Sequence, residues 1–364
     1  IGRRFQLVHV VFGQEIIETS TFRAPASESQ ATDDHGRILR DNEFGTHAQD
    51  AARRDFTINA LYYDPTTEEV IDYHNGVEDL KARSIKMIGD PRTRYREDPV
   101  RMLRAVRFAV KLNGTIHPDT RAPLQSMAEL IENVPASRLF DEMLKLLTCG
   151  HAMDCLQQLR QDGLHQGILP LLDVVLEQPG GEEFIELALD RTDHRIRSGK
   201  TVSPSFLFAA LLWNQVDLRW KKRIQAGEPS IQALMDAADS VLDEQTEKLA
   251  IQKRFSADMR EIWFMQPRFE KRLPKSIWRM FEQPRFRAAV DFLQLRAAAH
   301  QFDSVLAQWW MDLANADDAG RADMLEELSR LPKDASTTAP RSRSRRRRRS
   351  PAGTGRNESV TSQE

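Results

Sequence analysis

Two short polar blocks contain the side chains of this chain that are best suited to chemistry. The first is Arg53-Arg54-Asp55-Phe56-Thr57-Ile58-Asn59, where two cations, a carboxylate and an amide stand in an otherwise apolar segment. The second, Glu97-Asp98-Pro99-Val100-Arg101, is followed by further arginines. Arginines pair with phosphate oxygens, and carboxylates accept hydrogen bonds from amines. Together these groups could bind a ligand that carries anionic and hydrogen-bonding groups.

The second block also predicts the start of a helix. Asp98 can accept hydrogen bonds from the first free amides, and Pro99 is tolerated at the first helical position. Asp98 and Arg101 then lie one turn apart, and Arg104 and Arg107 extend the same face. An acceptor beside a forked donor can read the Watson–Crick edge of a base. The alternative is a capped helix whose three arginines are simply exposed to solvent.

Both blocks resemble motifs of the template-independent class II nucleotidyltransferases, which comprise bacterial poly(A) polymerases and tRNA CCA-adding enzymes. For the second block, the resemblance implies that Asp98 and Arg101 bind and select the incoming nucleotide. Arg104 and Arg107 would meet its phosphates or the RNA backbone.

For the first block, the resemblance implies a position at the active site. Asp55 would be a catalytic acidic residue, Arg53 and Arg54 would contact the triphosphate, and Asn59 would contact the ribose or anchor a helix. The alternative is that Asp55 only pairs with its arginine neighbours, since ion-pair networks also occur without function.

A further acid lies in the segment Glu15–Arg23. The resemblance makes Glu18 a catalytic carboxylate and a ligand of Mg²⁺ or Mn²⁺, with Glu15 nearer the hairpin turn; the alternative for Glu18 is a solvent-facing strand position. In this family a pair of aspartates supplies the main metal ligands, and that pair does not occur in the sequence from Ile1 onward. We therefore expect that pair upstream of residue 1, and an N-terminally truncated chain that is inactive as it stands.

Composition indicates a soluble globular protein of two or three domains. The 364 residues are 40% hydrophobic and 29% charged, and no apolar run is long enough to span a membrane. The longest apolar stretch, 206–213, is expected to be a buried helical segment. Cys149 and Cys155 match no metal or redox spacing and are typical of buried, reduced thiols in a cytoplasmic protein.

The first ninety or so residues predict short strands. Phe5–Phe12 and Glu15–Phe22 are rich in β-branched and aromatic residues around a Gly13-Gln14 turn, which indicates a hairpin. Residues 24–46 are small and polar and predict a long loop. Glu69–Tyr73, closed by an Asn75-Gly76 turn signal, and Ser84–Ile88 are further strand candidates.

From residue 97 onward only helices are expected. The periodic segments are 137–148, 152–163, 203–213, 230–255 and 287–311, and Pro and Gly clusters at 178–181 and 227–229 mark connections. The predicted class is therefore α+β. Its expected parts are the remainder of a nucleotidyltransferase head at 1–90, a helical nucleotide- and RNA-binding neck at 91–200, a helical body at 201–332 and a disordered basic tail at 333–364.

The tail concentrates positive charge, with nine basic and three acidic side chains in residues 333–364. Such a segment binds RNA of any sequence through its phosphates. The candidate RNA-binding residues are Arg345, Arg346, Arg347, Arg348 and Arg349. The alternative is a solvated run that adheres weakly to any polyanion.

The polymerase branch of the family is favoured by the segment 39–46, by the Trp/Phe/Arg-rich helical body and by the tail. The predicted activity is addition of AMP from ATP to RNA 3′ ends, with an RNA helicase or the RNA-decay machinery as candidate partners and no membrane. The alternatives are a CCA-adding enzyme and a non-catalytic RNA-binding module.

Overall fold

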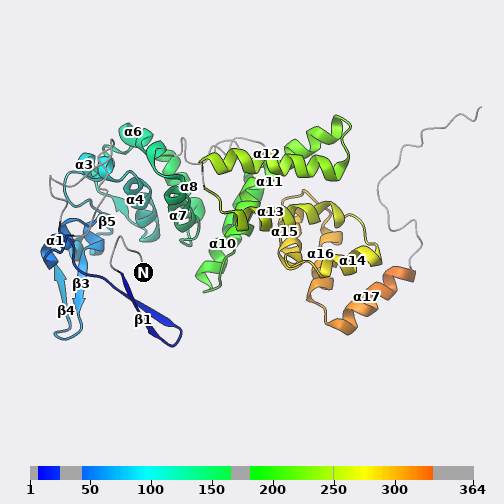
Figure 1. Ribbon diagram of the computed structural model, residues 1–364, viewed down its shortest axis with the longest axis horizontal. Coiled ribbons are helices and arrows are strands. Elements are labelled where there is room, and N and C mark those ends of the chain that lie inside the picture. The colour runs from blue at the N-terminus through cyan, green and yellow to red at the C-terminus, as the bar shows by residue number, and fades with distance from the viewer. Residues whose placement is uncertain (1–6, 25–42, 165–180, 249, 331–364) are drawn as a thin grey trace, which may run out of the picture.

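The computed structural model describes residues 7–24, 43–164, 181–248 and 250–330. Figure 1 shows an elongated molecule in which the strands lie at one end and the helices follow one another toward the other end. The expected α+β class is confirmed. Most of the predicted loop at 24–46, most of the 178–181 cluster and the whole Arg-rich tail lie outside the described residues.

The predicted N-terminal hairpin is present. Val8–Phe12 (β1) and Glu15–Thr19 (β2) pair in antiparallel fashion, with Phe12 opposite Glu15 across the turn. Gly13 adopts φ 60° in this turn, a left-handed conformation that glycine reaches without steric cost. Glu15 therefore lies beside the turn as expected, whereas the return strand ends at Thr19 rather than at Phe22.

A second antiparallel pair follows the first polar block. Leu61–Asp64 (β3) pairs with Glu69–Asp72 (β4), which confirms the strand expected at 69–73. The block itself follows the short helix His47–Ala52 (α1) and includes the 3₁₀ turn Thr57–Asn59 (η1).

The Asn75-Gly76 signal opens a helix, Gly76–Lys81 (α2), and does not form a hairpin turn. Asn75 takes the left-handed conformation at φ 60°. A Cβ on Gly76 would lie 2.2 Å from the carbonyl oxygen of Thr57, so only glycine allows this approach. The Thr57 hydroxyl also donates to Asp79 at 2.7 Å, and α2 thereby supports the first block.

One strand pair contradicts the expectation of helices alone beyond residue 97. Ser84–Ile85 (β5), within the predicted strand at 84–88, pairs in parallel with Thr115–Ile116 (β6). Two-residue strands carry no alternation that a sequence pattern could reveal. The pair joins the first part of the chain to the helices that follow.

The predicted helix after Asp98 is Val100–Lys111 (α4), and Asp98 accepts from the amide of Val100 at 3.3 Å. Pro99 stands just before the first helical residue, one place earlier than expected. A helix that was not predicted, Pro91–Glu97 (α3), ends at Asp98. The remaining neck elements are Pro118–Arg121 (α5), Leu124–Met127 (α6), Ala128–Asn133 (η2), Ala136–Leu147 (α7) and Ala152–Gln161 (α8).

The body is helical, and two of its predicted helices are each divided in two. The expected helix at 230–255 is Ser230–Lys248 (α12) and Lys253–Met265 (α13), and that at 287–311 is Phe286–Ala298 (α15) and Ser304–Asn315 (α16). His300 adopts φ 57° in the second break, and Asp303 caps α16. The other elements are Gly181–Arg197 (α10), Pro204–Gln225 (α11), Gln266–Arg268 (η3), Pro274–Phe281 (α14) and Asp318–Arg330 (α17).

One large core joins the neck to the first part of the body. It runs from Phe56 through α4, α7, α8 and α10 to α13, and a second cluster forms around Phe269 and Trp310. The apolar stretch 206–213 lies in α11, and every residue from Leu207 to Trp213 is buried. Helix α4 therefore has a firmly packed apolar side, which fixes the direction of its arginines. Among the described residues, no helix has the length and apolar content of a membrane span.

Candidate nucleotide-binding site

The two polar blocks meet around one cavity, although some forty residues separate them in the chain. The cavity has a volume of about 390 Å³. Its lining residues are Arg54, Asp55, Asn59, Asp98, Arg101, Arg104, Phe108 and Arg138. Six of the nine residues predicted for nucleotide or catalytic contacts in the head and neck are therefore brought together here.

Asp55 joins the first block to helix α4. Its Oδ2 accepts from Nε of Arg104 at 2.7 Å, and its Oδ1 accepts from the Asn59 amide at 3.0 Å. The same Oδ1 accepts from the backbone N–H of Phe56 at 2.9 Å. With the side chain only 10% exposed, the carboxylate is fixed in place by three donors.

These contacts control the ionisation of Asp55. Burial acts to raise its pKa, but the charge of Arg104 and the hydrogen bonds from Asn59, Arg104 and Phe56 outweigh burial, and the pKa is lowered. Burial acts in the opposite sense on Arg104, where the charge of Asp55 prevails and raises the pKa. The two groups form a charged pair at neutral pH.

The side chains proposed to read the base are held by neighbours. Asp98 accepts from Nη2 of Arg138, on α7, at 2.5 Å. Nη1 of Arg101 donates to Glu97 at 2.9 Å and to the carbonyl of Arg94 at 2.8 Å. Acceptor and donor thus both face the cavity from supported positions.

The two arginines of the first block have different surroundings. Arg54 lines the cavity, and its guanidinium pairs with Asp50 at 3.0 Å. Asp50 also accepts from the Tyr62 hydroxyl at 2.8 Å. Arg53 does not line the cavity, but its carbonyl accepts from Arg94 at 2.7 Å, as does that of Arg54.

The basic face predicted on α4 is only partly directed at the cavity. Arg104 lines it, whereas Arg107 stacks on the ring of Phe108 at 4.4 Å and lies 3.9 Å from Glu142 of α7. Burial lowers the pKa of Arg107, against the opposing charge of Glu142. Arg107 therefore packs between α4 and α7.

Glu18 is not brought to this cavity. It lies on β2 with its side chain 66% exposed, 3.5 Å from Nε2 of His9. Within the described ranges, no group of three or more His, Cys, Asp or Glu side chains could hold a metal ion. The carboxylate of Asp55 is already bound by three donors, so the described residues do not fit an Mg²⁺ or Mn²⁺ site.

Three residues that shape the site were not predicted from the sequence. Arg138 supports Asp98, Arg94 ties α3 to the backbone of the first block, and Glu142 lies 3.6 Å from Arg104. Arg94 stood only three positions before the second block, and a helix predicted at 91–97 would have placed it on that side. Arg138 and Glu142 carried no local signal, because only packing of α7 on α4 brings them near.

The cysteines are a reduced pair outside this cavity. Their sulfur atoms are 3.5 Å apart, and Cys155 is buried as expected while Cys149 is only partly buried. A hydrogen bond from Cys155 lowers the pKa of Cys149 to about 7, although burial opposes this.

Solved structures with a similar fold include a CCA-adding enzyme and a tRNA-processing enzyme. The Bacillus stearothermophilus CCA-adding enzyme in complex with CTP is 22% identical and covers 91% of this chain and 67% of its own, with a TM-score of 0.51. A tRNA-processing enzyme with CTP, 18% identical, covers 91% and 83%, with a TM-score of 0.57. This chain therefore shares the fold of these two enzymes.

Sequence relatives define the branch. Poly(A) polymerase I of Salmonella typhi is 43% identical over 98% of this chain and 78% of its own length, and that of Haemophilus influenzae is 42% identical over 91% and 75%. A CCA-adding enzyme of Levilactobacillus brevis is 45% identical but over only 41% of this chain.

Three family models match successive parts of the chain. They are described as the poly A polymerase head domain (residues 1–86), the "Probable RNA and SrmB- binding site of polymerase A" (114–176) and the polymerase A arginine-rich C-terminus (226–350). The chain belongs to the bacterial poly(A) polymerase family, which confirms the branch expected from the sequence.

Proposed function

We propose that the protein adds AMP from ATP to RNA 3′ ends without a template, and that the 390 Å³ cavity between the two polar blocks holds the incoming ATP. The observation that carries this proposal is the convergence of both blocks on one cavity with an excess of positive charge. Four arginines and two aspartates line it, a balance that suits an anionic ligand.

In the proposed complex, Asp98 and Arg101 select adenine. The adenine edge offers an exocyclic amine to Asp98 and a ring nitrogen to Arg101. Nη1 of Arg101 makes both of its described hydrogen bonds, to Glu97 and to the carbonyl of Arg94. Its other nitrogens can therefore reach the base, while Arg138 keeps Asp98 in position.

The phosphates are proposed to meet Arg54 and Arg104, because these guanidinium groups lie on the Asp55 side of the same cavity. Asn59 lies beside Asp55 and is proposed to contact the ribose or to fix that carboxylate. Arg53 supports the site through its backbone contact with Arg94. Glu18 lies away from this cavity and has no role in the proposed ATP complex.

The proposed reaction is an in-line displacement. The RNA 3′ hydroxyl attacks the α-phosphorus of ATP, a new phosphodiester bond forms, and the bond to the β-phosphate oxygen breaks to release pyrophosphate. A positively charged, pre-arranged cavity assists by stabilising charge on the phosphates. A requirement for Mg²⁺ or Mn²⁺ stays a prediction from the family resemblance.

The proposed partners are the 3′ ends of RNA and an RNA helicase or another part of the RNA-decay machinery. The helicase or decay protein is proposed to bind the neck. The description of the family model matched at 114–176, which names a second binding role beside RNA, supports this. Cytoplasmic localisation stays a prediction, based on the two cysteines, which form no disulfide.

The test uses the full-length protein, labelled ATP and two primers, an unstructured RNA and a tRNA lacking its 3′ end. We expect long AMP tracts on the unstructured RNA and strong preference for ATP over CTP. Addition that stops after C, C and A on tRNA would replace this proposal with the CCA-adding alternative. RNA binding with no incorporation of any nucleotide would support the non-catalytic module.

A further inference from the structure

A second and larger cleft lies where the predicted neck meets the body, between α10, the connection 198–203 and α15. Its volume is about 790 Å³, within the range of about 300–1,000 Å³ usual for ligand sites. The segment that the family model describes as an RNA-binding site ends at residue 176, before the first lining residue of this cleft, Ala188. None of the predicted site residues lines it.

The charged side chains of the cleft are mostly basic. Five are arginine or lysine and two are aspartate, and His194 adds a further group that can be protonated. The basic residues are Arg191, Arg195, Lys200, Arg285 and Arg287. They come from both walls, but Arg285 and Arg287 pair with Asp258 and Asp291, so the unneutralised positive charge lies on α10 and the connection after it.

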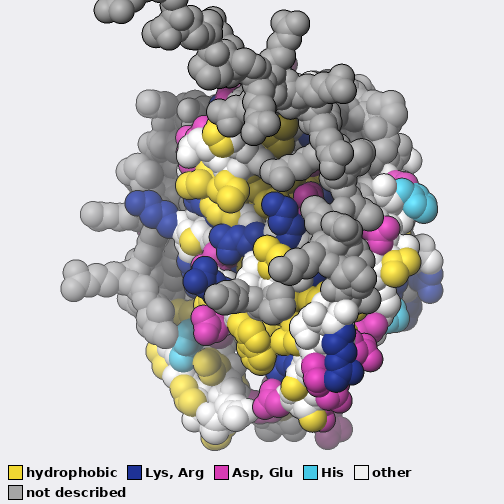
Figure 2. Space-filling view, turned by 90° about the vertical axis from the view of Figure 1, so that its right-hand side faces the viewer, with side chains coloured by type: hydrophobic (Ala, Val, Ile, Leu, Met, Phe, Trp, Pro, Cys, Tyr) yellow, Lys and Arg dark blue, Asp and Glu magenta, His cyan; other side chains and the backbone are white. Residues whose placement is uncertain are grey.

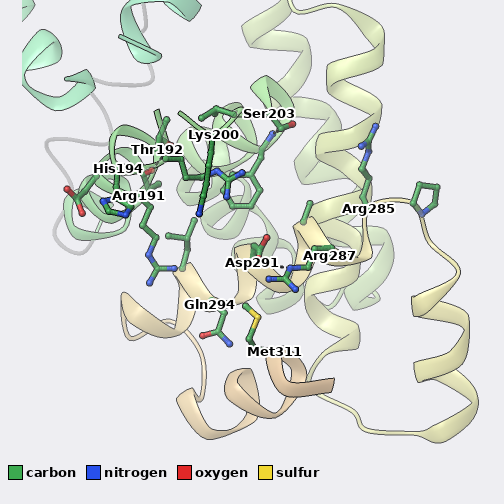
Figure 3. A pocket seen from close by; sticks show the side chains of 18 residues that line it. Arg191, Thr192, His194, Lys200, Ser203, Arg285, Arg287, Asp291, Gln294 and Met311 are labelled. Atoms are coloured by element: carbon green, nitrogen blue, oxygen red, sulfur yellow. Dashed lines mark hydrogen bonds and ion pairs between the residues drawn. The ribbon is translucent and has the colours of Figure 1, made fainter. Parts of the chain in front are cut away.

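Arg191 and Lys200 are the cations available to a ligand. Both are exposed, and within the described part of the chain neither donates a side-chain hydrogen bond or lies at ion-pair distance from a carboxylate. In Figure 3 Arg191, on α10, and Lys200, on the connection after α10, lie across from Asp291 and Arg287. Arg287 pairs with Asp291 at 3.2 Å, and Arg285 is directed to Asp258.

The connection that carries Lys200 is held in a defined shape. Nη2 of Arg195 donates to the carbonyl of Thr201 at 3.0 Å, and the Ser203 hydroxyl accepts from the amide of Phe206 at the start of α11. Gly199 adopts φ 70° in this turn. The lysine is therefore presented at the cleft by an ordered segment.

The cleft also offers apolar and hydrogen-bonding surface. Phe206 is only partly buried and packs edge-on against Phe292 at 6.1 Å, so one face can take a flat ring. Gln294 uses its amide nitrogen on the carbonyl of Ala307, which leaves its oxygen directed to the cleft. Phosphate-binding cations beside an aromatic ring are the elements with which proteins hold single-stranded nucleic acid.

We propose that this cleft binds the RNA strand behind its 3′ end, with phosphates on Arg191 and Lys200 and a base against Phe206. The inference rests on the proposed function, since it takes RNA as the substrate. A strand can offer successive phosphates to Arg191 and Lys200 while one of its bases contacts the partly buried ring of Phe206. Figure 2 shows the C-terminal face of the body, where basic and hydrophobic side chains lie side by side with acidic side chains among them.

The test compares full-length Arg191→Ala/Lys200→Ala with a matched Lys222→Ala/Lys271→Ala variant, whose exposed lysines do not line the cleft. Binding of a fluorescein-labelled single-stranded oligoadenylate is followed by anisotropy over a series of KCl concentrations. We expect roughly tenfold weaker binding for the cleft variant, and a salt slope smaller by about 1.4 because each lost phosphate contact removes about 0.7. The matched variant should bind like the wild type.

A second measurement fixes the location and the type of ligand. RNA containing 4-thiouridine is cross-linked to the wild type with and without excess ATP, and we expect cross-linked peptides from 198–206 or 284–294 that ATP does not remove. Equal affinity of the two variants, or cross-links confined to other segments, overturns the cleft assignment. Loss of the cross-links with ATP assigns the cleft to free nucleotide and also overturns it.

A single substitution, Lys200→Glu, separates failure of the cleft assignment from failure of the proposed AMP addition. Because Lys200 lies exposed in a connection, Lys200→Glu tests the cleft without disturbing a helix. RNA affinity that is insensitive to this change, in a protein that still adds AMP, removes the cleft and leaves the activity. Failure to add AMP, with the cross-links intact, removes the activity and leaves the cleft.

Discussion

The two cavities described above, between the polar blocks and beside α10, differ in how their charged side chains are held. In the smaller cavity, Asp55 is bound by three donors, Arg104 pairs with it and Asp98 is fixed by Arg138. In the larger cleft, Arg191 and Lys200 are exposed and have no described ion-pair partner. The first arrangement fixes geometry before a ligand arrives, whereas the second leaves cations free to adapt.

This difference matches two kinds of recognition. Choosing one base requires an acceptor and a donor at set positions, and their position depends on neighbours that lock their rotamers. Holding RNA of varied sequence requires only positive charge and a stacking surface, both of which tolerate any base. Changes in the smaller cavity should therefore alter selectivity and rate, and changes in the cleft should alter RNA affinity.

The largest expected effect is that of Asp55→Asn on activity. The substitution weakens the contact that places Arg104, and misplacement of a positioning group costs about 100-fold in rate. AMP incorporation by full-length protein should fall by about that factor, with RNA affinity unchanged. Glu69→Gln, an exposed strand position, is the control. A parallel loss of RNA affinity in Asp55→Asn would show that the two cavities do not have separate roles.

The same substitution should alter acid stability, with a somewhat smaller effect. Since the pKa of Asp55 is lowered in the folded state, its contribution is complete above the unfolded pKa of about 3.9 and is lost as pH falls through the folded pKa. At pH near 7 we expect Asp55→Asn to lower the free energy of unfolding by about 1–3 kcal/mol. In urea unfolding at progressively lower pH, the difference in the free energy of unfolding between wild type and Asp55→Asn should shrink. A difference that does not depend on pH would contradict the charged pair.

Arg138→Ala should have a smaller effect on the rate parameters. Loss of its hydrogen bond frees Asp98 to change rotamer, and because Arg138 is about half exposed (49%) we expect the KM for ATP to rise about 5- to 10-fold. Arg138→Lys should fall between wild type and alanine, since lysine keeps the charge but not the fork. If the two cavities have separate roles, Arg191→Ala should leave the KM for ATP unchanged. An equal rise of this KM in Arg138→Ala and Arg191→Ala would contradict separate roles.

Local patterns predicted the hairpin, β4 and α4, because each has alternation or a capping signal of its own. β5 lies within the strand predicted at 84–88, but β6 and its parallel pairing with β5 were not predicted, because a two-residue strand carries no periodicity. The division of the helix expected at 287–311 escaped because its break, near His300, contains neither glycine nor proline.

The site shows the same limit. Asp55, Asp98 and Arg101 stood in recognisable blocks, and folding brought them to one cavity. Arg138 is forty residues from Asp98, so only the packing of α7 reveals it. Arg107 belonged to the predicted basic face, yet Glu142 and Phe108 hold it away from the cavity.

The most direct test of base selection is the ratio of kcat/KM for ATP to that for CTP in wild type and Asp98→Ala. Loss of one base-reading contact is worth about 1–3 kcal/mol, so we predict that the ratio falls about 10- to 100-fold while RNA affinity stays constant. An unchanged ratio in a folded Asp98→Ala protein would contradict the assignment of this cavity to the incoming ATP.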